Sequence, residues 1–156
     1  MLKWRRRFDM ITLYTIGFTK KSAEHFFNLI RDNNVKELVD VRISGSSQLA
    51  GFAKAKDLGF FVKEICHISY KSIMDFAPTK DLLDKWHKQE VTWEEYESIY
   101  IKMLKDRDVI RKYGVKTFDS SCFLCSEDTP EYCHRRLLVE YLQKNSSEKV
   151  RIVHLI

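Results

Sequence analysis

The chain has 156 residues, of which 44% are hydrophobic and 31% are charged, a composition typical of one soluble globular domain. It contains no run near the roughly 20 apolar residues that a membrane-spanning helix needs, and no apolar stretch of signal-peptide type follows its N-terminus. Four cysteines without a secretory signal therefore predict reduced thiols, a cytoplasmic location and no membrane partner.

The net charge of +5 is unevenly distributed. Residues 1–9 hold four cations and one anion, a net +3, which leaves +2 for the rest of the chain. We therefore predict a basic leader over residues 1–9, disordered or not native, followed by a single α/β domain over residues 10–156. A genuine leader could hold a phosphate backbone electrostatically, so nucleic-acid binding stands as an alternative with weak support.

Hydrophobic and β-branched runs predict five strands along the chain. In chain order these are Ile11–Gly17, Glu37–Arg42, Cys66–Tyr70, Phe118–Ser126 and Val150–Leu155. Helical spacing and capping residues predict the intervening helices. These are Ser22–Asp32, Ala53–Ile65, Lys80–Lys88, a helix begun by the capping box Thr92–Glu95, and a last helix with Thr129 as cap and Pro130 as its first residue.

The alternation of strands and helices predicts an α/β fold. We expect a mostly parallel sheet of about five strands flanked by helices, with a helical insertion before the fourth strand. The aromatic residues of that insertion, Trp86, Trp93, Tyr96 and Tyr100, have the spacing of packing residues. Stacking on bases is their alternative role.

The stretch from Cys125 to Arg135 has the greatest concentration of reactive side chains. It holds Cys125, Glu127, Cys133, His134 and Arg135, where a predicted strand ends and a predicted helix begins. Such junctions hold the ligands of open α/β folds, and a helix N-terminus favours thiolate. Cys133 in that first turn is one candidate nucleophile. Cys125 either resolves it or is itself the nucleophile, and two inert buried thiols are the alternative.

A zinc site is the first idea that Cys122, Cys125, Cys133 and His134 suggest. Residues three apart on a strand point to opposite faces, which separates Cys122 from Cys125. Cys125, Cys133 and His134 could still form a three-ligand site, but consecutive residues on a helix diverge by about 100°, which separates Cys133 from His134. The sequence therefore predicts no metal and no other cofactor, with Cys122 as a core thiol.

An anion-binding loop is predicted after the second strand. Asp40 and Arg42 end that strand, and a small hydroxyl-bearing turn through Ser47 follows, a sequence that can offer backbone N–H groups to phosphate. Arg42 and Arg135 would add forked donors. An internal ion pair between Asp40 and Arg42 is the alternative. Dinucleotide and P-loop motifs are absent from the sequence.

Taken together, these motifs resemble the domain-of-unknown-function 488 family over almost the whole chain from Ile11. The resemblance is carried by Thr15-Ile-Gly17, Asp40-Val-Arg42 with Ser47, Ala77-Pro78, Trp93 with Tyr96 and Tyr100, Leu124-Cys-Ser-Glu127 and Cys133-His-Arg135. It implies a small α/β protein with a cleft built from Asp40, Arg42, Cys125, Glu127, Cys133, His134 and Arg135. It implies no particular substrate.

The leading functional hypothesis is an enzyme-like cleft acting on a small anionic, phosphorylated or nucleotide-related ligand. Cys125, Glu127, Cys133 and His134 would be catalytic, while Asp40, Arg42, Ser47 and Arg135 would bind the ligand. A non-enzymatic nucleic-acid or nucleotide binder and a thiol redox-responsive protein are the alternatives. All three hypotheses leave the oligomeric state open.

Overall fold

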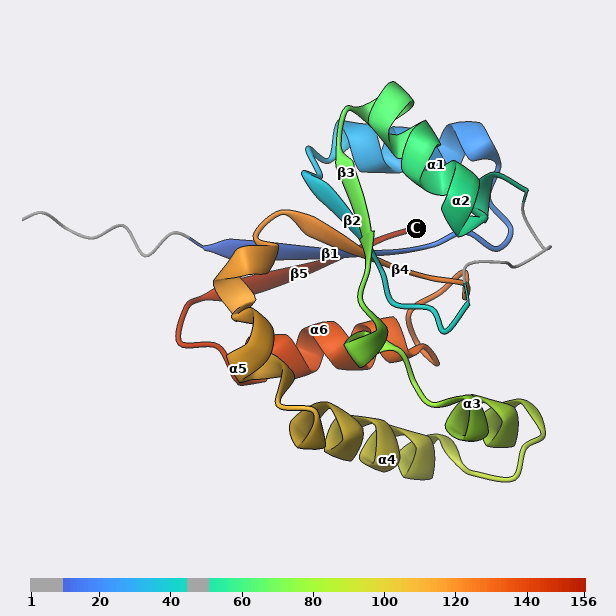
Figure 1. Ribbon diagram of the computed structural model, residues 1–156, viewed down its shortest axis with the longest axis vertical. Coiled ribbons are helices and arrows are strands. Elements are labelled where there is room, and N and C mark those ends of the chain that lie inside the picture. Colours follow the sequence, from blue (N-terminus) through green and yellow to red (C-terminus); the bar gives the residue numbers. More distant parts are fainter. Residues whose placement is uncertain (1–9, 45–50) are drawn as a thin grey trace, which may run out of the picture.

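The structure is a computed structural model that describes residues 10–44 and 51–156. Within these ranges, five strands form one all-parallel sheet in the order β3-β2-β4-β1-β5 (Figure 1). The strands are β1 (Ile11–Gly17), β2 (Glu37–Asp40), β3 (Ser69–Ser72), β4 (Ser121–Cys125) and β5 (Val150–Leu155). The predicted α/β fold class is confirmed, and every pairing in the sheet is parallel.

Helices cover both faces of the sheet (Figure 1). They are α1 (Ala23–Asp32), α2 (Ala55–Phe61), α3 (Lys80–His87), α4 (Trp93–Asp106), α5 (Val109–Tyr113) and α6 (His134–Lys144). The helices α1 and α2 lie on one face, and α6 lies on the other with α4 packed against it. The helices α3, α4 and α5 form the predicted helical insertion between β3 and β4.

The hydrophobic core is divided by the sheet into two clusters. Alternate residues of β4 enter different clusters, Phe123 and Cys125 on the side of α6, and Cys122 and Leu124 on the side of α1. This alternation follows from the period of two along a strand. Cys122 is a buried core thiol, and it points away from Cys125 as the strand periodicity predicts.

Two predicted strand starts are wrong because helical turns occupy those residues. The third strand begins at Ser69 rather than Cys66, since α2 continues as a π-helical turn over Val62–Cys66. That turn ends at His67, whose φ of 57° is left-handed. The fourth strand begins at Ser121 rather than Phe118 because Val115–Phe118 forms a 3₁₀ helix.

The start of the last helix also differs from the prediction. The carbonyl of Pro130 accepts a hydrogen bond from the Cys133 N–H at 3.3 Å, which closes a turn instead of opening a helix. Cys133 then has extended backbone angles, φ −134° and ψ 136°, and precedes the first helical residue, His134. The predicted cap Thr129 therefore lies outside α6.

Two sequence predictions concern residues that the description does not cover. The basic leader at 1–9 and the candidate ligand-binding residue Ser47 both lie outside the described residues. Within the described part, no helix is long and apolar enough to cross a membrane.

Candidate functional site

The candidate site lies at the carboxyl end of β4. This strand sits between β2 and β1. The helices that follow β1 and β2, namely α1 and α2, lie on one face of the sheet, whereas α6, which follows β4, lies on the other (Figure 1). Neighbouring strands whose connections depart to opposite faces leave a crevice between them, which is where open α/β sheets bind ligands. Cys125, the last residue of β4, therefore lies at a ligand-binding position of the fold.

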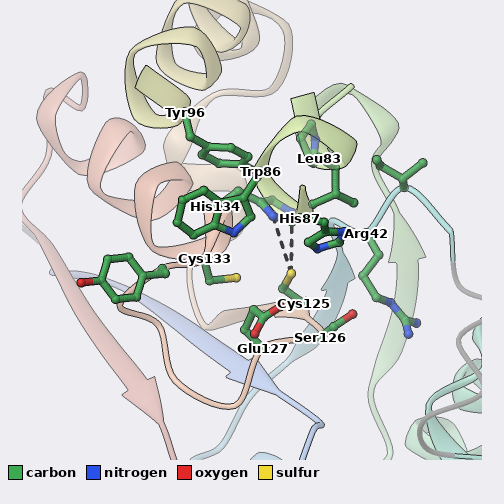
Figure 2. A pocket seen from close by; sticks show the side chains of 13 residues that line it. Arg42, Leu83, Trp86, His87, Tyr96, Cys125, Ser126, Glu127, Cys133 and His134 are labelled. Atoms are coloured by element: carbon green, nitrogen blue, oxygen red, sulfur yellow. Dashed lines mark hydrogen bonds between the residues drawn. The ribbon is translucent and has the colours of Figure 1, made fainter. Parts of the chain in front are cut away.

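A cavity of about 230 Å³ opens at this point. Its walls combine sulfur, imidazole and carboxylate groups with aromatic rings from the helical insertion (Figure 2). The lining residues are Arg42, Ile43, Pro78, Leu83, Trp86, His87, Tyr96, Cys125, Ser126, Glu127, Tyr132, Cys133 and His134. All four predicted catalytic residues are among them.

The loop after β4 is held against the end of β1. Thr19 donates to the Ser126 carbonyl from both its N–H, at 3.2 Å, and its hydroxyl, at 2.6 Å. The Lys21 ammonium pairs with the Asp128 carboxylate at 2.8 Å. Gly17 allows this close approach, because a Cβ at that position would collide with the carbonyl of Glu127.

Cys125, Cys133 and His134 converge at the cavity. One sulfur or nitrogen atom from each lies within 4.8 Å of the others, and the Cys125 Sγ is 3.6 Å from His134 Nδ1 and 3.8 Å from Nε2 (Figure 2). The expected divergence of Cys133 and His134 is wrong because Cys133 is extended rather than helical. The main argument from the sequence against a three-ligand site therefore does not hold.

His134 also links the ends of two strands. Its Nε2 lies 2.9 Å from the Val41 carbonyl oxygen, just beyond β2. A carbonyl can only accept, so Nε2 carries the hydrogen and Nδ1 of the neutral ring is left with a lone pair. This imidazole therefore connects the ends of β2 and β4.

Of the two site thiols, Cys125 is the one that favours the thiolate. The S–H of Cys133 donates to it, and the backbone N–H groups of Ser126 and Glu127 and the charge of Arg135 add to this. These contacts outweigh burial and lower the pKa of Cys125. Burial and the neighbouring Cys125 thiolate together raise the pKa of Cys133 well above its ordinary value. The first proton therefore leaves Cys125.

Arg135 supports the loop and does not line the cavity. Its side chain is fully buried. Nη1 donates to the Glu127 carbonyl at 2.5 Å and to the Cys133 sulfur at 3.4 Å, and Nη2 donates to the Asp128 carbonyl at 3.3 Å. These contacts fix the loop that carries Glu127.

Asp40 and Arg42 form a buried ion pair, the alternative that the sequence left open. Arg42 donates from Nε to Asp40 Oδ1 at 2.9 Å and from Nη2 to Oδ2 at 2.6 Å. The Tyr70 hydroxyl donates to Oδ2 at 2.6 Å, and burial followed by this hydrogen bond raises the pKa of Tyr70. In Figure 2 the Arg42 guanidinium points away from Cys125.

Two groups of the site were not predicted from the sequence. Tyr132 was not predicted, although it directly precedes Cys133 in the turn that Pro130 closes. Its ring centroid lies 5.4 Å from that of Trp93 and 6.2 Å from that of Trp86. The backbone carbonyl of Val41 could not be predicted from the sequence, because every residue has a backbone carbonyl.

A parallel sheet with two thiols and an imidazole at one strand end defines an α/β protein with a cysteine-centred cleft. The family model described as "Domain of unknown function DUF488" matches residues 22–142, and the chain belongs to this family. The matched range includes every candidate site residue from Asp40 to Arg135. Comparisons with curated proteins and with solved structures give no significant match.

Proposed function

We propose that the protein is an enzyme in which the Cys125 thiolate attacks an electrophilic atom of a small ligand bound in the cavity, and the leaving group departs with the electron pair of the broken bond and takes up a proton from His134. One observation carries this proposal: the Cys125 sulfur lies at the cavity with His134 beside it and hydrogen-bond donors that stabilise its thiolate. A stabilised thiolate is the nucleophilic form of cysteine.

His134 and Glu127 are the proton-handling groups in this proposal. The bond from Nε2 to the Val41 carbonyl fixes the neutral ring, so that Nδ1 can take a proton from the thiol or from the ligand. Glu127 lines the same cavity and is exposed, so its carboxylate can exchange protons with solvent. Cys133 acts as the hydrogen-bond donor to Cys125.

The ligand that the cavity favours is small and partly planar. A volume of about 230 Å³ is below the roughly 300–1,000 Å³ typical of pockets for drug-sized molecules. Trp86, Tyr96 and Tyr132 form aromatic walls on which a flat ring can stack. Within the predicted nucleotide-related ligand, the cavity therefore supports a nucleobase or a similar ring better than it supports a phosphate.

The phosphate part of that prediction has less support. Arg42 is paired with Asp40, and Arg135 is bonded to carbonyl groups of its own loop. Neither guanidinium points into the cavity with a pair of N–H donors available to a phosphate. Non-enzymatic nucleic-acid binding stays a prediction from the basic leader.

A second candidate function is reversible thiol oxidation. The ligand atoms of Cys125 and Cys133 lie within 4.8 Å of each other, and a disulfide needs the sulfur atoms to close to about 2.05 Å. A mass measurement after mild peroxide treatment tests this candidate. A loss of two hydrogens in the wild type but not in Cys133→Ala supports it, and an unchanged mass refutes it.

The nucleophile proposal is tested by alkylation with iodoacetamide across a range of pH values. We expect Cys125 to react at pH 7 faster than a free thiol of ordinary pKa, with Cys66 as an internal comparison, because burial raises the pKa of Cys66. A Cys125 rate no higher than that of Cys66 refutes the proposal.

A variant identifies the cause of the reactivity. In Cys133→Ala the S–H donor is lost, so the pKa of Cys125 rises and its pH–rate profile moves to higher pH. Circular dichroism checks that the variant is folded. An unmoved profile shows that Cys133 does not activate Cys125.

A further inference from the structure

We propose that Cys125, Cys133 and His134 bind a thiophilic divalent cation, Zn²⁺ first among them. The three side chains place two sulfur atoms and one ring nitrogen within 4.8 Å of one another, and all three line one cavity. Thiolate and imidazole are the ligands that Zn²⁺ prefers. This inference uses the same cavity as the proposed function but does not rest on Cys125 acting as a nucleophile.

The distances suit a tetrahedral ion. Bond lengths of about 2.3 Å to sulfur and about 2.0–2.1 Å to nitrogen place two tetrahedral ligand atoms about 3.6 Å apart. Cys125 Sγ and His134 Nδ1 are 3.6 Å apart. Because Nε2 is only slightly farther from the sulfur, at 3.8 Å, the imidazole must turn about its Cβ–Cγ bond, a broad torsion, to aim Nδ1 at the ion.

Groups around the three ligands already provide the outer contacts of a metal site. Metal-binding histidines donate their second N–H to a carboxylate, a carbonyl or a water, and His134 Nε2 has the Val41 carbonyl at 2.9 Å. Metal-bound thiolates accept N–H hydrogen bonds, and Arg135 Nη1 lies 3.4 Å from the Cys133 sulfur. Backbone N–H groups of Ser126 and Glu127 serve Cys125 in the same way.

The number of ligands indicates an open site. Two thiolates balance the charge of Zn²⁺, and three protein ligands leave the fourth tetrahedral position free, as in catalytic rather than structural zinc sites. The cavity that the three residues line gives a water or a small ligand access to that position. Glu127 lines the same cavity and supplies a carboxylate to such a water.

Metal binding and thiol chemistry compete for Cys125. A bound Zn²⁺ ion withdraws electron density from the Cys125 sulfur, so the coordinated thiolate attacks an electrophile more slowly than the free thiolate does. The metal-free and metal-bound forms of the protein therefore differ in reactivity at the same residue.

Cobalt binding tests the proposal on the metal-free full-length chain. Co²⁺ is expected to bind one ion per chain with a sulfur-to-metal charge-transfer band and the visible bands of a tetrahedral site, and Zn²⁺ should displace it. Cys125→Ser, Cys133→Ser and His134→Gln should each weaken Co²⁺ binding by more than the about 10–100-fold that loss of an outer-shell partner costs. The matched control is Cys66→Ser, because Cys66 packs in the other core cluster and should leave the spectrum unchanged.

A measurement on the wild type alone keeps the test independent of variant folding. Zn²⁺ should protect Cys125 and Cys133, but not Cys66, from alkylation detected by mass spectrometry. No charge-transfer band together with no protection overturns the metal site, as does a band that survives in folded Cys125→Ser. Fast alkylation of Cys125 without cobalt binding refutes the metal site and leaves the proposed function standing. Cobalt binding to a protein whose metal-free Cys125 is unreactive supports the metal site and refutes the proposed function.

Discussion

Gly17 is the residue on which the position of the site loop depends most directly. A Cβ there would collide with the Glu127 carbonyl and lie 3.0 Å from Arg135 Nη1. Both obstacles belong to one hydrogen-bonded arrangement around the buried Arg135 side chain, so neither can move cheaply. The glycine before the Thr19 contacts therefore lets β1 and the loop after β4 lie against each other.

Gly17→Ala should destabilise the protein by about 1–3 kcal/mol or more, as overpacking of a well-packed region does. It should also slow alkylation of Cys125, because the displaced loop carries the N–H groups of Ser126 and Glu127. Denaturant unfolding and alkylation rates measure the two effects. Gly51→Ala is the control, since nothing lies within 4 Å of a Cβ at that position, and equal stability of the two variants would contradict the argument.

The buried ion pair at the end of β2 makes a second prediction at the residue scale. Asp40→Asn leaves the Arg42 guanidinium, only 4% exposed, without its counter-charge. Loss of one partner of a buried pair costs about 3–5 kcal/mol. Asp32→Asn, at an ion pair whose side chains are 53% and 65% exposed, should change the free energy of unfolding little. Similar losses in both variants would show that the Asp40 pair is not structurally important.

The residue types alone could predict which residues belong to the site, but not which groups those residues contact. Cys125, Glu127, Cys133 and His134 all line the cavity, and their chemical types were the signal. The roles of Arg42 and Arg135 depend on which carboxylate or carbonyl lies nearest. That information is three-dimensional, and a single sequence does not contain it.

At the scale of elements, the capping box placed the start of α4 correctly. The Thr92 hydroxyl accepts from the Glu95 N–H at 3.2 Å, and the Glu95 carboxylate accepts from the Thr92 N–H at 2.8 Å, as the capping box predicts. The cap predicted at Thr129 was wrong because the Pro130 carbonyl forms a turn with Cys133. Proline at a helix start and proline in a turn have the same local sequence signal.

Thr92→Ala should cost about 1 kcal/mol, the usual effect of losing an N-cap. The loss acts on α4, whose Tyr96 forms part of the cavity wall. Ser98→Ala is the matched control, because it removes an exposed hydroxyl from the interior of the same helix, where alanine is the better helix former. Chemical denaturation compares the two, and a Ser98→Ala loss as large as that of Thr92→Ala would contradict the capping role.

At the scale of the whole molecule, the fold class followed from the pattern but the strand order did not. Alternating strands and helices require a parallel sheet with both faces covered. The three strands in the middle of the sheet are all mostly buried, so their periodicity does not say which lies beside which. The position of β4 between β2 and β1 is what joins the Val41 carbonyl, the Cys125 thiol and the β1 end in one site.

The charged groups that hold distant parts of the chain together predict how the whole molecule responds to acid. Burial and the charge of Arg135 lower the pKa of His154 on β5, next to the Thr15 hydroxyl of β1. Hydrogen bonds from Tyr113 and Lys112 lower the pKa of Asp75, and one from Lys21 lowers that of Asp128. In each case the unfolded chain binds the proton more readily, so stability falls as pH falls.

Two windows of acid sensitivity follow from these directions. Stability should begin to fall below about pH 6.5, where an unfolded histidine takes up its proton, and fall again below about pH 4 as Asp75 and Asp128 are protonated. His154→Gln should reduce the fall of the free energy of unfolding in the first pH range. His25→Gln, at an exposed position on α1, should leave that fall unchanged. Urea unfolding between pH 7 and pH 3 measures both windows. An equal slope between pH 7 and pH 5 in the wild type and in His154→Gln would show that the β1–β5 contact does not control the response.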